Sequence, residues 1–209
     1  MRDFFAGVEN RGTNPWPEGR ADLHWHLLPP STPHTVDTLL APYTQLTRYP
    51  GMEEVLPKWL HLTVLHAGPT TTATAPEITQ MTDRVRDAVA GTGPIRMTFS
   101  RPSIGSLGIE RSARPGAPLR RLWDITWKAT TAVVGDRWEL LPAVPYPHIT
   151  IAYAGRDAPD DAGRADMKGL LADVDAGEVA LEFGTLTLVS QWHTHKRIVW
   201  ERLAEIPLG

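Results

Sequence analysis

The sequence of 209 residues contains no cysteine. This absence excludes disulfides, thiol nucleophiles, iron–sulfur clusters and cysteine-ligated zinc. The sequence also has no apolar run near the roughly 18 residues that a membrane-spanning helix needs. The first residues, MRDFFAGVENRG, carry acidic side chains and lack the apolar segment of a secretory signal. We therefore expect a cytoplasmic protein that does not associate with a membrane.

An excess of positive charge is also missing. The 21 lysine and arginine residues against 24 aspartate and glutamate residues give a formal net charge of −3, without the basic field of a duplex DNA binder. A nucleic-acid partner is therefore expected to be small, such as a nucleotide or an RNA terminus. Hydrophobic residues make up 42% of the chain, which is enough to build a core. The modest charge and the lack of heptad repeats favour a monomer.

Several catalytic signatures are absent as well. The chain has no Gly-Lys-Ser/Thr phosphate loop, no Gly-x-Ser-x-Gly nucleophile turn and no His-Glu-x-x-His zinc helix. ATP use is therefore not indicated, and no cofactor is expected. Two His-x-His pairs, His24/His26 and His193/His195, leave a zinc-dependent hydrolase as an alternative, although zinc needs three or four ligands in tight geometry. His193 and His195 fall in a predicted turn, where exposure to solvent is expected.

Hydrophobic periodicity predicts an α+β fold. Residues 1–20 show little periodicity and are interpreted as an N-terminal arm, and residues 21–209 as a single bilobal domain. Alternation and β-branched runs predict strands at 21–28, 58–67, 95–100, 106–110, 147–153, 178–190 and 197–204. Helical spacing bounded by proline and glycine predicts helices at 33–41, 76–90, 118–134 and 162–174.

The order of these elements suggests an internal duplication. Residues 60–68 read LHLTVLHAG and residues 147–155 read PHITIAYAG. Aligned without gaps, His61 falls on His148 and Thr63 on Thr150, an offset of 148 − 61 = 87 residues. A helix and then a β-hairpin are predicted after each copy. A duplicated packing motif is the simpler alternative, but it does not explain an ionisable ring in both apolar strands.

The spacing within each motif places its two polar side chains together. Residues i and i+2 of a strand point to the same face, so each histidine shares a face with its threonine. A pseudo-twofold relation between the halves then brings the two faces together across a cleft. His66 has the opposite strand parity, so we expect it to point away from the cleft unless a bulge intervenes.

Such a cleft is suited to phosphorus chemistry. Imidazole has an unperturbed pKa of about 6.5, so one ring can act as a general base and the other as a general acid. Threonine hydroxyls can donate hydrogen bonds to the non-bridging oxygens of a phosphate. In-line displacement at phosphorus places the entering and leaving oxygens on opposite sides, which matches two imidazoles on opposite walls.

The twin His-x-Thr-x motifs resemble those of the two-histidine (2H) phosphoesterase superfamily, and within it the 2′-5′ RNA ligase-like branch. The resemblance covers roughly residues 21–204. It implies two antiparallel sheets flanked by helices, in a pseudo-twofold bilobal arrangement around a central cleft. It also implies metal-independent, cofactor-free phosphodiester chemistry in RNA processing, on 2′,3′-cyclic phosphates or 2′-5′ linkages, with RNA-end ligation as the reverse of such a transesterification.

Carried over residue by residue, the resemblance makes His61 and His148 the acid–base pair, and Thr63 and Thr150 the phosphate ligands. It does not decide which histidine is the base; for hydrolysis we favour His148 as the base and His61 as the acid. Some members of the superfamily carry a basic residue directly after the second motif, whereas here the first one is Arg156. The preferred substrate therefore stays open.

Aromatic residues near the motifs are candidates to bind a base, because stacking tolerates any base. We expect substrate contacts from Tyr146, Tyr153 and Trp192, and from His26 if it lines the cleft. The main alternative to an enzyme is a non-catalytic module that binds a nucleotide or an RNA end in the same cleft.

Overall fold

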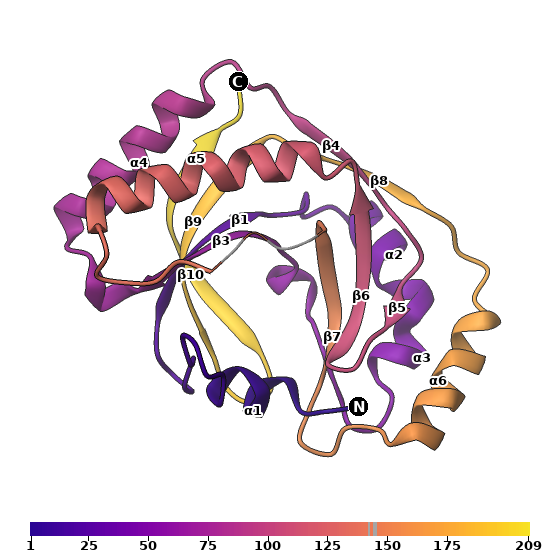
Figure 1. Ribbon diagram of the computed structural model, residues 1–209. Coiled ribbons are helices and arrows are strands. Elements are labelled where there is room, and N and C mark those ends of the chain that lie inside the picture. The colour runs from indigo at the N-terminus through magenta and orange to yellow at the C-terminus, as the bar shows by residue number, and fades with distance from the viewer. Residues whose placement is uncertain (142, 144–145) are drawn as a thin grey trace.

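The computed structural model describes residues 1–141, 143 and 146–209. It has the predicted α+β architecture, in which two antiparallel sheets face each other and helices flank them (Figure 1). Among the described residues, no helix combines the length and the apolar character needed to cross a bilayer.

The first sheet carries the first motif. Its strands follow the order β10-β9-β1-β3, and every neighbouring pair is antiparallel. The four strands are β1 (Asp22–Leu27), β3 (Leu62–Pro69), β9 (Thr185–His193) and β10 (Ile198–Pro207). All six residues of β1 are buried, because this strand lies inside the sheet between β9 and β3.

The second sheet carries the second motif. Its strands follow the order β2-β7-β6-β4-β8, and a short strand β5 pairs with β6. The six strands are β2 (Met52–Glu54), β4 (Ile95–Phe99), β5 (Ser103–Ile104), β6 (Gly108–Arg114), β7 (His148–Ala154) and β8 (Val179–Phe183).

The helices pack around these sheets. α4 and α5 contact each other; α4 packs on β10 and α5 packs on β3, both in the first sheet. On the second sheet, α2 contacts β8 and α6 contacts β5. The helices are α1 (Phe4–Glu9), α2 (Pro33–Leu39), α3 (Thr44–Thr47), α4 (Ala75–Val89), α5 (Ala117–Val134) and α6 (Asp161–Ala172), with single turns η1 (Ala41–Tyr43), η2 (Pro57–Trp59) and η3 (Thr70–Thr72).

Helix α4 shows why the local sequence predicts these elements well. Glu77 accepts a hydrogen bond of 2.8 Å from the backbone N–H of Thr74, which satisfies a donor at the start of the helix. Met81, Val85 and Val89 follow at intervals of four residues and are buried, so they form the apolar stripe that faces the core.

The C-terminal strands depart from the prediction. The sequence predicts one strand over 178–190, but the chain leaves the second sheet at Gly184. β8 pairs with β4, whereas β9 pairs with β1 and β10. In the same way, β4 and β6 follow the first motif in sequence but share a sheet with β7 of the second. The sheet of each motif therefore includes strands from the other half of the chain.

The N-terminal arm has more structure than its sequence indicates. Asp3 accepts hydrogen bonds from the backbone N–H groups of Phe5 and Ala6 and so caps α1. Phe4 packs on Tyr153 of the second sheet, and Phe5 packs on His193 of the first. The arm therefore bridges the two sheets (Figure 1).

Candidate active site

The two motifs meet in one cavity between the sheets. His61, Thr63, His148 and Thr150 all line this cavity, which has a volume of about 260 Å³. His61 directly precedes β3 and His148 is the first residue of β7, so equivalent positions of the two repeats face the same space.

The two imidazoles are held by equivalent hydrogen bonds. His61 Nδ1 lies 2.9 Å from the carbonyl oxygen of Trp59, and His148 Nδ1 lies 3.2 Å from that of Tyr146. In both cases the acceptor is the residue two positions earlier in the chain. Because a carbonyl oxygen only accepts, Nδ1 carries the proton in both rings, and Nε2 of each ring is the atom that can exchange a proton with a ligand.

The electrostatic surroundings of the two rings differ. Burial lowers the pKa of His61 to about 4; the Trp59 carbonyl opposes this shift, and the charge of His148 adds to it. The His148 side chain is 29% exposed, and its Nε2 lies 3.8 Å from Oε2 of Glu110. His61 is therefore neutral near pH 7, whereas a protonated His148 has a carboxylate beside it.

Glu110 is a site residue that sequence analysis does not identify. It lies on β6 directly opposite Thr150 of β7, so the two side chains share a face of the sheet. Glu110 also accepts a hydrogen bond from the hydroxyl of Tyr146. No local pattern marks this glutamate, because only the pairing of β6 with β7 brings it to the motif.

A row of buried histidines lies behind His61. The His26 ring stacks on His61 with centroids 4.4 Å apart, and the His24 ring stacks on His66 at 4.3 Å. Burial holds the pKa values of His24 and His26 well below their usual range, so both rings are neutral near pH 7. Neither ring nitrogen of His26 has a hydrogen-bond partner among the described residues.

His66 ends this row in a charged network. Its Nε2 lies 2.6 Å from Oδ2 of Asp22, and Arg20 donates two hydrogen bonds of 2.9 and 2.8 Å to the same carboxylate. His66 lines the cavity of the two motifs, which strand parity allows only if a bulge intervenes. The register between β1 and β3 shifts opposite Trp25/His26, and this bulge reverses the strand parity between Thr63 and His66.

The arm supplies the other side of the cavity. Phe4, Val8, Arg11 and Trp16 all line it, and sequence analysis identifies none of them as a site residue. Burial lowers the pKa of the Arg11 guanidinium, with Asp22 acting in the opposite direction, but an arginine keeps its charge near neutral pH. Its Nε is buried and has no partner among the described residues. Arg11 is therefore a cation placed to meet an anionic ligand.

The four residues expected to contact substrate are placed differently. Tyr153 lines the cavity, whereas Tyr146 is 43% exposed and lines a separate hollow beside Glu110. His26 is fully buried behind His61. Trp192 is not among the described residues that line the cavity. Its neighbour Gln191 lines it, and strand alternation turns Trp192 to the opposite face of β9.

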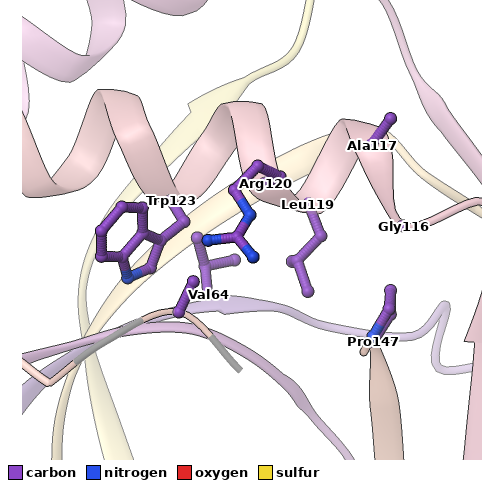
Figure 2. A pocket seen from close by; sticks show the side chains of 8 residues that line it. Val64, Gly116, Ala117, Leu119, Arg120, Trp123 and Pro147 are labelled. Carbon is purple, nitrogen blue, oxygen red and sulfur yellow. The ribbon is translucent and has the colours of Figure 1, made fainter. Parts of the chain in front are cut away.

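A second cavity of about 280 Å³ lies under α5, and neither His61 nor His148 is among the residues that line it. Figure 2 shows Arg120 and Trp123 of α5 above Val64, with Pro147 at the other end. Val64 follows Thr63 and Pro147 precedes His148, so this cavity adjoins the motifs on the helix side of the sheet.

Two groups of side chains in the described part of the chain have metal-ligand geometry. They are Asp22, His24 and His66, and Glu9, His193 and His195. Arg20 already pairs with both oxygens of Asp22, which opposes a cation in the first group. Neither group contains His26, so the pair His24/His26 does not form the metal site that a zinc-dependent hydrolase requires.

Comparison with solved structures finds the same architecture in other proteins. TT0787 of Thermus thermophilus superposes with a TM-score of 0.65 at 18% identity, over 90% of this chain and 97% of that one. E. coli LigT complexed with 3′-AMP gives 0.65 at 15% identity, over 90% and 98% of the two chains. The chain has the LigT-like fold.

A further structure described as a phosphoesterase gives a TM-score of 0.62 at 14% identity, over 90% and 98% of the chains. No protein-family model and no curated protein matches the sequence. The LigT-like fold confirms the architecture implied by the resemblance to 2H phosphoesterases, although sequence identity to these structures is low.

Proposed function

We propose that this protein is a metal-independent phosphodiesterase that hydrolyses a 2′,3′-cyclic phosphate or a 2′-5′ phosphodiester bond in a nucleotide or an RNA end. One observation carries the proposal: two imidazoles with the same Nδ1 anchoring line one cavity together with two threonines. A pair of imidazoles supplies both proton transfers that phosphodiester hydrolysis needs.

The unequal surroundings of the two rings support different roles for them. Neutral His61 takes a proton from water at Nε2 as the water oxygen bonds to phosphorus. The ester oxygen leaves on the opposite side and receives the Nε2 proton of His148, which is partly exposed and lies 3.8 Å from the Glu110 carboxylate. This assignment is the reverse of the one favoured from the sequence, because burial of His61 favours its neutral form.

The remaining polar groups hold the phosphate. Thr63 and Thr150 donate hydrogen bonds to its non-bridging oxygens, and Arg11 offsets its negative charge. With a 5′-hydroxyl in place of water, the same groups join RNA ends, which we expect at high concentrations of the ends. The base packs against Phe4, Trp16 or Tyr153 in the cavity. The 3′-AMP in the complex of E. coli LigT supports a nucleotide-sized ligand.

The test is turnover of 2′,3′-cyclic nucleotides and 2′-5′ dinucleotides in the presence of EDTA. We expect activity, and a fall in kcat of about 10²–10⁴-fold in His61→Ala and in His148→Ala, the usual contribution of general acid–base catalysis. No turnover of either substrate class, or unchanged kcat in both variants, overturns the proposal. Nucleotide binding without any product identifies the protein instead as a non-catalytic nucleotide or RNA-end binding module.

A further inference from the structure

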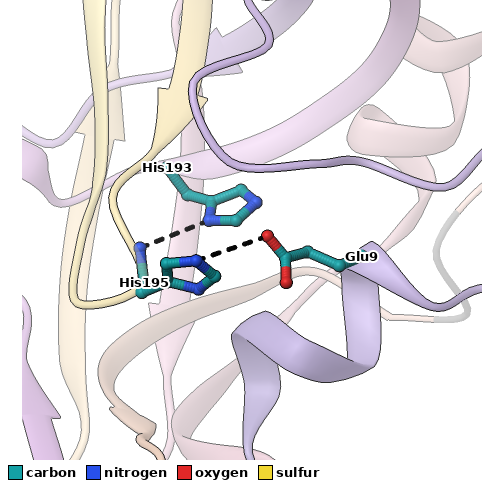
Figure 3. Close-up of side chains that lie close together, drawn as sticks. All are labelled: Glu9, His193 and His195. Carbon is teal, nitrogen blue, oxygen red and sulfur yellow. Dashed lines mark hydrogen bonds and ion pairs between the residues drawn. The ribbon is translucent and has the colours of Figure 1, made fainter.

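The second His-x-His pair takes part in neither motif and is not used by the proposed reaction. His193 ends β9 and His195 lies in the turn that leads to β10. Glu9, at the end of α1, approaches both of them (Figure 3). One ligand atom from each of these three residues lies within 4.8 Å of the other two. The cluster therefore joins the N-terminal arm to the β9–β10 hairpin.

His193 is fixed with one nitrogen directed away from the cluster. The side chain is fully buried, and its Nε2 lies 2.8 Å from the carbonyl oxygen of Trp16. This acceptor places the proton on Nε2 and leaves a lone pair on Nδ1. This lone pair accepts a long hydrogen bond of 3.4 Å from the backbone N–H of His195, which a bound ion would replace. A ring that donates one N–H to a backbone carbonyl is typical of a metal-binding histidine.

His195 closes the cluster from the solvent side. Its φ of +56° lies in the left-handed region, which favours glycine in a hairpin turn. Its Nε2 lies 3.6 Å from Oε1 of Glu9 and 3.1 Å from Oε2 of Glu18. Zn²⁺ bonds of about 2.0–2.1 Å in a tetrahedron place neighbouring ligand atoms about 3.3 Å apart, close to both distances. The side chain is 42% exposed, so an ion can enter from solvent.

We propose that Glu9, His193 and His195 bind a zinc ion, with a solvent molecule at the fourth position. Two imidazoles and a carboxylate suit Zn²⁺, and Glu18, whose Oε2 lies 3.1 Å from Nε2 of His195, adds negative charge beside the ion. The ion fastens the arm to the hairpin. Because Val8 and Trp16 of the arm line the catalytic cavity, zinc binding also holds that side of the cavity in place. The site is structural, and hydrolysis proceeds without it.

An ion pair is the simpler interpretation of the same contacts. A protonated His195 pairs with Glu9 and Glu18 without any metal, and Nδ1 of His193 then keeps its 3.4 Å hydrogen bond from the backbone N–H of His195. The two interpretations differ in one measurable respect, which is stoichiometric uptake of zinc.

The test is titration of EDTA-treated full-length protein with zinc chloride by calorimetry, and with cobalt chloride by visible absorption. We expect one zinc per chain and a cobalt spectrum of tetrahedral type. His195→Gly removes a ligand yet suits the positive φ, so the apo protein stays folded while zinc affinity falls about 100-fold or more, the upper end of what loss of an orienting partner costs. Glu9→Gln is expected to weaken binding in the same direction.

Two control variants make the result specific. His34→Ala removes an exposed histidine on α2 and is expected to bind zinc as the wild type does. His24→Ala disrupts the group of Asp22, His24 and His66 and is also expected to retain zinc. The absence of stoichiometric binding overturns the proposal, as does binding that survives in His195→Gly or is lost in His24→Ala. Each of these results is independent of cyclic nucleotide turnover, so the two proposals can fail separately.

Discussion

The imidazole ring of His26 lies stacked on that of His61, with ring centroids 4.4 Å apart and ring planes 24° apart. His26 is completely buried, and neither of its nitrogens has a partner in the described part of the chain. Its contribution is therefore the flat surface that supports His61. Because no hydrogen bond is lost, a phenyl ring is expected to replace it.

We predict opposite outcomes for two substitutions at this position. His26→Phe retains the stacked surface and removes an unsatisfied polar group, so stability and kcat are expected to stay level or rise. His26→Ala leaves a void, which is expected to cost about 2–4 kcal/mol and to lower kcat, because His61 loses its support. Urea denaturation and cyclic nucleotide turnover measure the two effects. Wild-type stability and turnover in His26→Ala would contradict this account.

The buried histidines also predict how stability depends on pH. Burial keeps His24, His26 and His61 neutral in the native protein and holds their pKa values below the usual 6.5. The unfolded chain takes up protons at these positions as the pH falls below about 6.5, so acid favours unfolding. The free energy of unfolding is expected to fall by up to about 1.4 kcal/mol per pH unit for each such histidine.

Urea denaturation between pH 5 and pH 8 measures this slope. His26→Phe removes one of the three groups, so its stability is expected to fall less steeply below pH 6.5. His34→Phe changes an exposed histidine and is expected to keep the wild-type slope. Equal slopes in all three proteins would show that the buried rings do not resist protonation.

The parts of the site that sequence predicts are those fixed by local pattern. The spacing of His61 and Thr63, and of His148 and Thr150, places each pair on one face of a strand, and the structure directs both faces into one cavity. The helix over 76–90 was likewise evident from the spacing of its apolar residues, and α4 spans Ala75–Val89. Such features depend on residues that lie only a few positions apart in the sequence.

The parts that sequence does not predict depend on contacts between distant segments. Glu110 joins the site only because β6 pairs with β7. His66 enters the cavity through a bulge that strand parity alone does not reveal. The break at Gly184 depends on which sheet the strand on each side of it joins. The packing of Phe4 against Tyr153 depends on where the N-terminal arm lies relative to the second sheet.

Removal of the buried Asp22 carboxylate is expected to cause a large loss of stability. Asp22 is fully buried and receives hydrogen bonds from Arg20 and from His66 at 2.6–2.9 Å. Asp22→Asn keeps the shape but leaves Arg20 without a counter-charge, and we expect it to cost about 3–5 kcal/mol. Arg20 is 27% exposed, so solvent compensates part of this cost.

A double-mutant cycle measured by urea denaturation tests the pairing. The double variant Asp22→Asn/Arg20→Gln is expected to lose less than the sum of the two single losses, because the two charges disappear together. Additive losses would mean that the two side chains act independently.

Substitution of Arg11 is expected to lower the affinity for substrate. It lines the cavity of the two motifs from the arm, with a buried Nε that has no partner among the described residues. A charged hydrogen bond contributes about 1.5–3 kcal/mol, so Arg11→Gln is expected to lower kcat/KM for a cyclic nucleotide about 10- to 150-fold. Most of this loss is expected in KM, because a guanidinium that binds the phosphate would do so both before and during the reaction. Steady-state kinetics on Arg11→Gln and on Arg121→Gln, an exposed arginine of α5, separate this contact from a general effect of charge. Equal kinetics in the two variants would place the phosphate away from the arm.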